Sequence, residues 1–140
     1  MSKETRFSDP AVRAAFDKFP ADQQAHLLLM RGLVFDAASR EAAVGEIAES
    51  LKWGEPSYVP VKPKVGSPFR MGSHDADNVA LYFNCNTMLV ERIRGVYGDD
   101  LVYSKNRAVL FPVNKALPES KAIACMCLAL TYHRDKIRVL

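Results

Sequence analysis

The sequence lacks most of the features that identify a function directly. Its 140 residues include only three cysteines and one tryptophan. A small, odd number of cysteines argues against a disulfide framework and favours a reducing compartment. The N-terminus carries charges of both signs and leads into no apolar segment, so we do not expect a signal peptide. No apolar run approaches the roughly 20 residues that a bilayer-spanning helix needs. These absences predict a cytoplasmic protein that does not insert into a membrane.

The short motifs of catalysis and phosphate binding are also missing. The sequence contains no Gly-x-Gly-x-x-Gly or Walker pattern, no Gly-x-Ser-x-Gly elbow, and no Cys-x-x-Cys or His-x-x-x-His pair. We therefore expect a binding protein rather than an enzyme and predict no catalytic residue. The net charge of +3 permits an anionic ligand. It is too small and too scattered to predict nucleic-acid binding by itself.

The composition is that of one ordinary folded domain covering residues 1–140. Apolar residues make up 49% and charged residues 25% of the chain, with no linker or repeat dividing it. Residues 1–19 are expected to form an N-terminal extension with a short helix through Val12 and Phe16. A second helix is predicted from Pro20 to about Arg40, because apolar residues recur there every three or four positions. The same spacing in Val44, Ile47 and Leu51 predicts a third helix.

Beyond the third predicted helix the apolar residues alternate, which is typical of strands. Three strands are predicted around residues 58–62, 69–71 and 81–84, followed by a short helix near 89–93. Two more strands are predicted at 101–103 and 108–113, and a last helix from Pro118 carries Ile123, Cys127, Leu130 and Arg134 on one stripe. The order ααα-βββ-α-ββ-α groups the strands, which favours an α+β fold with an antiparallel sheet packed against helices.

Polar side chains on the predicted strands suggest a binding site. If the alternation is correct, these residues point away from the core, and the loops beside them add further polar groups. An aromatic wall with arginines and amides suits a small ligand that carries a carboxylate or phosphate. The alternative is an exposed or helix-covered sheet face in which Arg70 pairs with Glu55. The candidate ligand-binding residues are Trp53, Glu55, Tyr58, Arg70, Tyr82, Asn84, Thr87 and Arg107.

Metal and thiol chemistry have weaker signals. His74, Asp75 and Asp77 could ligate a metal, but a hairpin turn in which Asp and Asn bond the local backbone explains them better. Asp22 and Asp36 are the weak candidates on the early helices, where acidic residues alternate with arginines. Cys125 and Cys127 point about 160° apart on a helix. Cys85 follows the apolar side of its strand, so we expect it to be buried.

One set of segments resembles a known family. Leu51-Lys-Trp-Gly-Glu-Pro-Ser-Tyr58, Phe69-Arg70, Leu81-Tyr-Phe-Asn-Cys85 and Asn106-Arg-Ala108 resemble the YdhG-like family of small bacterial domains of unknown function. The resemblance begins near Pro20 and continues to Tyr132 and His133. It implies a curved antiparallel sheet packed against helices, similar to frataxin and to the YjbR-type proteins. Some members are regarded as intracellular iron chaperones, so the resemblance also implies iron as a cofactor or cargo.

Three functions therefore stay open. The first is a cytoplasmic protein that holds a small anionic ligand or a metal complex on the polar sheet face. The second is a frataxin-like iron donor that uses the helical carboxylates. The third is a nucleic-acid or protein interaction module. The acids on the helices are interspersed with arginines, which favours the sheet face over an acidic ridge. The residues do not decide between a monomer and a homodimer.

Overall fold

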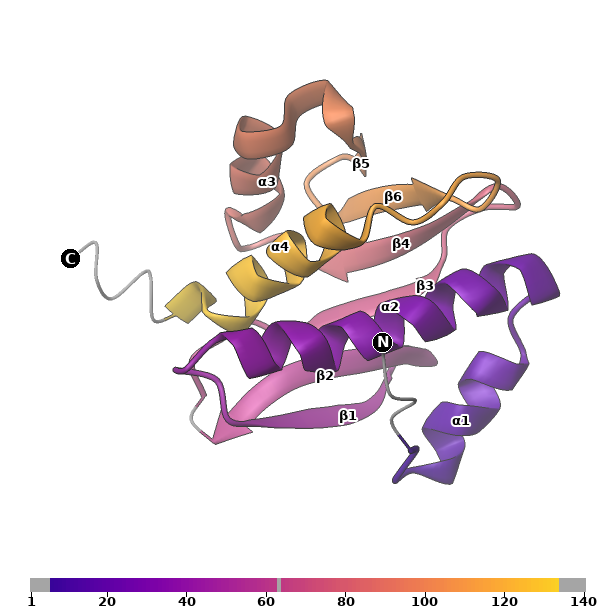
Figure 1. The fold of residues 1–140 in the computed structure, drawn as a ribbon, viewed down its shortest axis with the longest axis horizontal. Helices are drawn as coiled ribbons and strands as arrows, with labels where there is room; N and C mark the ends of the chain where they lie inside the picture. The colour runs from indigo at the N-terminus through magenta and orange to yellow at the C-terminus, as the bar shows by residue number, and fades with distance from the viewer. Residues whose placement is uncertain (1–5, 63, 134–140) are drawn as a thin grey trace.

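The computed structural model describes residues 6–62 and 64–133. These residues form an α+β fold in which one antiparallel sheet of six strands packs against helices (Figure 1). The helices are α1 (Pro10–Asp17), α2 (Ala21–Arg40), α3 (Leu89–Tyr97) and α4 (Glu119–Leu130), with the 3-10 turn η1 (Gly98–Asp100) after α3. The strands are β1 (Glu46–Lys52), β2 (Glu55–Lys62), β3 (Phe69–Ser73), β4 (Asn78–Phe83), β5 (Val102–Ser104) and β6 (Ala108–Pro112).

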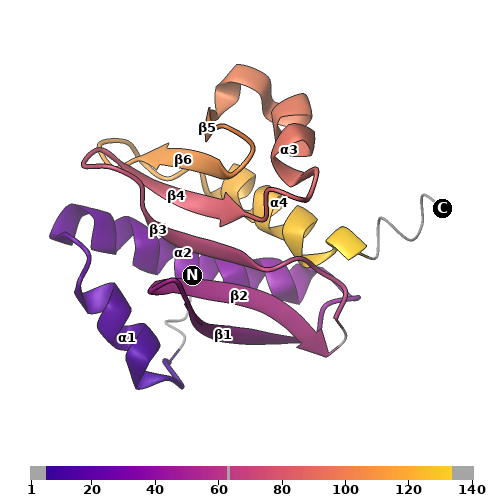
Figure 2. The ribbon, with the colours of Figure 1, turned by 180° about the vertical axis from the view of Figure 1, so that it is seen from behind.

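The sheet has one covered face and one open face. Its strand order is β1-β2-β3-β4-β6-β5, so the first four strands form a meander and β6 inserts between β4 and β5. Helices α2 and α4 lie side by side across one face, and α1 lies beside the β1–β2 end (Figure 1). From behind, the strands lie in front of α2 and α4, and no described helix crosses β2, β3 and β4 on that side (Figure 2). We call these the covered face and the open face.

The core fills the space between the covered face and the helices. Tyr58, Phe69 and Phe83 occupy paired positions on β2, β3 and β4, and their ring centroids lie 5.9 Å and 6.2 Å apart in succession. Met30 of α2 and Met126 of α4 are fully buried in the same cluster. Burial of large aromatic and aliphatic side chains on this scale is the main source of stability for such a layer.

The first two helices follow the sequence prediction. The Asp9 side chain accepts a hydrogen bond from the Ala11 N–H, and Pro10 occupies the first position of α1, so the helix start is well capped. Val12 and Phe16 are fully buried in the main core. The segment predicted as an N-terminal extension therefore includes a helix that contributes to the core.

The prediction of a third helix through Val44, Ile47 and Leu51 is wrong. Residues 46–52 form strand β1, which pairs with β2 through a register that runs outward from Lys52 opposite Glu55. The connection is the two-residue turn Trp53-Gly54, with φ angles of 74° and 77°. Positive φ at both central positions is the geometry that matches the twist of two paired strands. Pairing with β2 thus overrides a helical spacing of apolar residues, and the observed order is αα-ββββ-α-ββ-α.

The C-terminal half agrees with the sequence prediction. Helix α3, strands β5 and β6, and helix α4 all form close to the predicted positions. Arg134, which we placed on the stripe of the last helix, lies outside the described residues. Within residues 6–62 and 64–133, no helix combines the length and the apolar character required to cross a bilayer.

Candidate functional site

A groove of about 750 Å³ opens at one end of the open face. Segments far apart in the sequence form it: the β1–β2 turn, the start of β3, the end of β4 and the turn between β5 and β6. Its volume lies within the range of about 300–1,000 Å³ that is usual for small-molecule sites. We refer to it as the sheet groove.

Five of the eight predicted ligand-binding residues line the sheet groove, namely Trp53, Arg70, Tyr82, Asn84 and Arg107. Lys52 and Lys105 line it as well and were not identified from the sequence. Lys52 is the last residue before the β1–β2 turn, and Lys105 is the first residue of the β5–β6 turn. The signal that could have found them is therefore a cation beside a hairpin turn.

The strand register explains why these residues meet. Ser57, Arg70 and Tyr82 are directly opposite one another on β2, β3 and β4, and Ala108 and Ser104 continue the row on β6 and β5. Residues opposite each other in an antiparallel sheet point to the same face. The small side chains of Ser57, Ala108 and Ser104 leave space above the sheet, and the longer side chains border it.

Arg70 is paired with Glu55 at the edge of the groove. Its Nη1 donates a hydrogen bond to Glu55 Oε1 at 2.5 Å, and its guanidinium carbon lies 5.4 Å from the centre of the Tyr82 ring. The Glu55 carboxylate lies against Gly72, where any side chain would collide with it. The pairing of Arg70 with Glu55 that the sequence left as an alternative is therefore present, and it coexists with the groove.

Burial shifts the titration of this cluster. Burial raises the pKa of the Glu55 carboxyl above its ordinary value, and the nearby Arg70 lowers it only in part. Burial also raises the pKa of the Tyr82 hydroxyl, with a smaller contribution from the Glu55 charge. The Tyr82 hydroxyl donates to the Ser73 carbonyl at 3.2 Å and lies 3.3 Å from Nδ1 of His74. His74 also lines the groove, as a polar neighbour of Tyr82.

Tyr58 does not lie in the groove, and its predicted orientation is wrong. It is opposite Phe69 on the covered face and is fully buried. Its hydroxyl donates to Glu49 Oε2 at 2.7 Å, and Arg31 Nε donates to the same oxygen at 2.6 Å. The Tyr58 ring is more stable packed against the aromatic rings of the core than exposed to solvent, and its hydroxyl has a hydrogen-bond acceptor in Glu49. These requirements select the opposite alternation for β2.

Thr87 is also absent from the groove lining, whereas Asn84 is present. The Thr87 hydroxyl donates to the Asn84 carbonyl at 2.7 Å and accepts a weak bond from the Leu89 N–H at 3.4 Å. It therefore stabilises the turn that leads into α3. Its place just after the strand put it near the site in sequence, but the turn directs its hydroxyl to the local backbone.

The acidic residues predicted as possible metal ligands do not lie together. Asp75 accepts from the Asp77 N–H at 2.9 Å and from the Asn78 amide at 3.0 Å, which is the predicted turn chemistry. Asp22 accepts from the Gln23 N–H, and Asp36 lies fourteen positions later on α2, about 21 Å along the helix axis. Among the described residues, no group of three or more His, Cys, Asp or Glu side chains could hold a metal ion.

The three cysteines differ in exposure: Cys125 is buried, Cys127 is partly buried and Cys85 is exposed. Burial raises the pKa of Cys125 to about 12 and that of Cys127 to about 11. Cys85 was predicted to be buried but is exposed and lines the sheet groove. The reason is that β4 ends at Phe83, so the strand alternation no longer applies two residues later.

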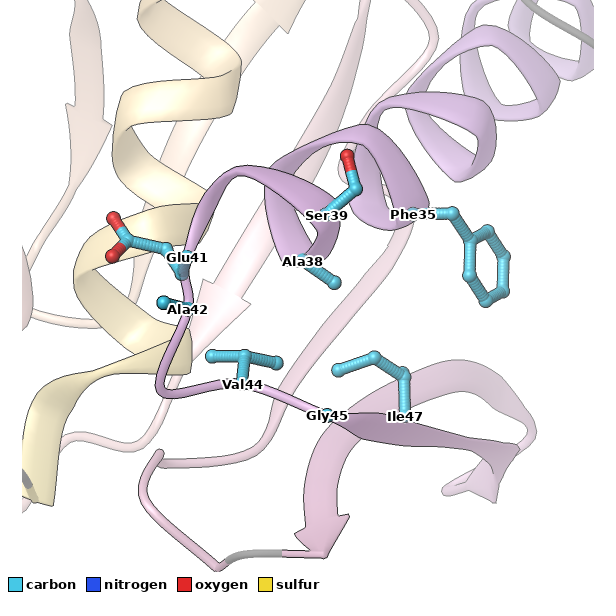
Figure 3. Close-up of a pocket in the computed structure, with 8 residues that line it drawn as sticks. All are labelled: Phe35, Ala38, Ser39, Glu41, Ala42, Val44, Gly45 and Ile47. Carbon is cyan, nitrogen blue, oxygen red and sulfur yellow. The ribbon is translucent and has the colours of Figure 1, made fainter.

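A second, smaller cleft of about 370 Å³ lies where α2 ends and β1 begins (Figure 3). Val44 and Ile47 point toward Ala38 and Phe35 of α2, so most of its surface is apolar (Figure 3). The Glu41 side chain projects away from these four residues (Figure 3). The cleft lacks the convergence of charged and aromatic groups that distinguishes the sheet groove.

Comparison with known proteins supplies no relative on which to model the site. No protein-family model matches the chain, and no curated protein or solved structure matches it significantly.

Proposed function

We propose that this protein binds a small anionic ligand in the sheet groove and holds it without transforming it. The observation that carries the proposal is the charge of the lining. The cations Lys52, Arg70, Lys105 and Arg107 line the groove. Among the described residues its lining includes no aspartate or glutamate, and the Glu55 carboxylate pairs with Arg70 at the edge. A concave surface lined by one sign of charge concentrates ions of the opposite sign.

The geometry of Arg70 supports a carboxylate or phosphate as the bound group. Within the described part of the chain, Arg70 donates a single hydrogen bond, from Nη1 to Glu55. Its side chain is 30% exposed, so the rest of the planar fork is accessible from the groove. Arginine pairs with carboxylate and phosphate through two parallel hydrogen bonds. Glu55 thus occupies one hydrogen-bonding position of the Arg70 guanidinium, and that position also suits an oxygen of the ligand.

Several of the segments that resemble the YdhG-like family coincide with this groove. Trp53, Arg70, Asn84 and Arg107 belong both to those segments and to the lining. A frataxin-like fold is the finer fold that the resemblance implies, and we propose the groove as the shared site of such a family. The iron-donor and interaction-module alternatives have no comparable cluster of described residues in their support.

The test is a titration with inorganic pyrophosphate and with citrate, followed by calorimetry and by backbone amide shifts in NMR. Both anions should bind and should move the amides of residues 52–57, 69–70 and 104–107. The double variant Arg70→Ala/Arg107→Ala should lose at least about tenfold in affinity, since each arginine contributes charge-assisted hydrogen bonds. Arg13→Ala/Lys18→Ala is the matched control, because it removes two exposed cations, one on α1 and one at its C-terminal cap, that lie outside the groove lining. Equal losses in the two double variants, or no binding of either anion, would contradict the proposal.

A further inference from the structure

Two strained backbone positions border the sheet groove from opposite ends. In the described part of the chain, Trp53 and Lys105 are the non-glycine residues with positive φ, at 74° and 53°. Both belong to the groove lining. Positive φ is unfavourable for bulky side chains and persists where the surrounding structure enforces it, most often at functional sites. Two such positions in one groove point to their side chains as functional.

The turn that carries Lys105 is fixed by neighbouring groups. Arg94 of α3 donates a hydrogen bond from Nη2 to the Lys105 carbonyl at 3.0 Å. The Phe83 N–H donates to the Arg107 carbonyl at 2.7 Å, which attaches the same turn to the end of β4. Lys105 and Arg107 therefore project from a positioned turn rather than from a loose loop.

Trp53 has no structural role that accounts for its position. The first place of this kind of turn favours Asn, Asp or Gly, and a tryptophan there is unfavourable. The residue is 89% exposed, so its side chain contributes almost nothing to the core. A large, flat and solvent-exposed aromatic surface beside cations is suited to stacking on a planar ring of a ligand.

The span of the groove limits the shape of the ligand. Trp53 follows edge strand β1, and Lys105 follows the opposite edge strand β5. The row from Ser57 on β2 to Ser104 on β5 crosses four strand spacings, about 19 Å at roughly 4.8 Å each. A compact anion would contact one end only. A ligand that uses both ends carries a ring at one end and several negative charges along its length.

We propose that the ligand is a nucleoside polyphosphate, with its base stacked on Trp53 and its phosphate chain directed toward Lys105 and Arg107. This inference rests on the proposed function and adds the chemical class of the ligand. A base supplies the planar ring, and a chain of phosphates supplies charge at intervals that one carboxylate cannot. Arg70 lies between the two ends and pairs with the phosphate nearest the nucleoside.

The test compares ATP, inorganic triphosphate and adenosine by calorimetry and by fluorescence. Because Trp53 is the only tryptophan of the chain, its fluorescence reports on this position alone. ATP should bind and quench the fluorescence, triphosphate should bind about tenfold more weakly without quenching, and adenosine should bind more weakly still. Stacking of a base on an aromatic side chain has an effect of this size. Trp53→Leu should lose about tenfold in affinity for ATP and less than about twofold for triphosphate.

Val102→Ala is the matched control, because Val102 is an exposed apolar residue of β5 outside the groove lining and should not change ATP affinity. Equal affinities for ATP and triphosphate, without quenching, would overturn the nucleoside assignment and leave anion binding intact. Equal affinities for ATP and adenosine would overturn the assignment of the phosphate chain. A single-stranded oligonucleotide that binds 100-fold more tightly than ATP would replace the nucleotide by a nucleic acid. Failure of ATP, triphosphate and pyrophosphate together would overturn both proposals.

Discussion

The two faces of the sheet carry clusters of the same three residue types. On the covered face, Arg31, Glu49 and Tyr58 form a hydrogen-bonded cluster in which the charged side chains are 4% and 6% exposed. On the open face, Arg70, Glu55 and Tyr82 form a cluster in which the charged side chains are 30% and 23% exposed. We call them the buried cluster and the open cluster. Their chemistry is the same, and their surroundings differ.

The two clusters differ in how many hydrogen bonds the arginine side chain donates to the protein itself. Arg31 donates from Nε and Nη2 to the two oxygens of Glu49 and from Nη2 to the Arg6 carbonyl, and its guanidinium lies 3.7 Å from the centre of the Phe7 ring. The Arg31 side chain therefore links α2 to β1, and most of its hydrogen-bond donors are already used in these contacts. Arg70 donates one described hydrogen bond and borders a groove. Burial therefore makes one cluster structural and leaves the other available for binding.

Removing the carboxylate should separate the two clusters most strongly. Glu49→Ala leaves a buried guanidinium without its counter-ion and should lower the free energy of unfolding by about 3–5 kcal/mol. Glu55→Ala breaks a partly exposed pair and should lower it by at most about 1 kcal/mol. Urea unfolding at neutral pH, with both variants measured beside the wild-type chain, gives the two values. Similar losses for both variants would show that burial does not distinguish the clusters.

Removing the tyrosine hydroxyls should repeat the contrast on a smaller scale. Tyr58→Phe deletes a buried bond of 2.7 Å to a carboxylate and should lower the free energy of unfolding by about 2 kcal/mol. Tyr82→Phe deletes a bond of 3.2 Å to a backbone carbonyl at the surface and should cost about 0.5 kcal/mol or less. The same urea titrations measure both effects. A larger loss for Tyr82→Phe would mean that the Tyr82 hydroxyl stabilises the β3–β4 hairpin.

The sequence predicted the open cluster better than the buried one for a physical reason. Arg70 and Tyr82 belong to strands with clear alternation, so their face could be assigned before the register was known. Arg31 lies within the second predicted helix and Glu49 within the third, and a charged residue on a helix is expected to be exposed unless it has a buried partner. Their burial depends on a pairing between α2 and β1 that no local pattern encodes.

The errors at β1 and Tyr58 have related causes. The segment 46–52 satisfies a helical and a strand spacing equally well, and the hairpin with β2 decides between them. For β2, valine at 59 and 61 and proline at 60 leave the two faces almost equally apolar, so alternation alone does not choose a face. The aromatic partners Phe35 and Phe69 make that choice. Both decisions are made by contacts between distant segments.

The tip of the β1–β2 turn offers a change that should separate stability from binding. Trp53→Asn places a residue that tolerates positive φ before Gly54 and should raise the free energy of unfolding by about 1 kcal/mol. Trp53→Leu keeps an apolar side chain in the strained position and should change it by less than about 0.5 kcal/mol. Thermal and urea unfolding would measure the pair. A less stable Trp53→Asn would show that the exposed indole supports the fold, which would weaken the case for its role in a ligand site.

The smallest expected effect is the pH dependence that Glu55 gives to the open cluster. Because burial raises its pKa in the folded protein, Glu55 binds a proton more tightly when folded than when unfolded. Its contribution to stability is present below the ordinary carboxyl pKa and is lost as the pH rises through the raised value. The difference in unfolding free energy between the wild-type chain and Glu55→Gln should therefore fall as the pH rises above the ordinary carboxyl pKa, by less than about 0.5 kcal/mol because solvent screens the group.

Arg70→Gln is the control that tests whether this small pH dependence comes from Glu55. Arg70 lowers the pKa of Glu55 in part, so its removal should raise that pKa further and move the loss of stability to higher pH. The measurement is urea unfolding at half-unit pH steps for the wild-type chain and the two single variants, with Glu55→Gln/Arg70→Gln as the reference for Arg70→Gln. A difference that rises with pH would mean that the ion pair outweighs burial. Glu55 would then be held mainly by its ion pair with Arg70, and an anionic ligand would compete with Glu55 for the Nη1 donor.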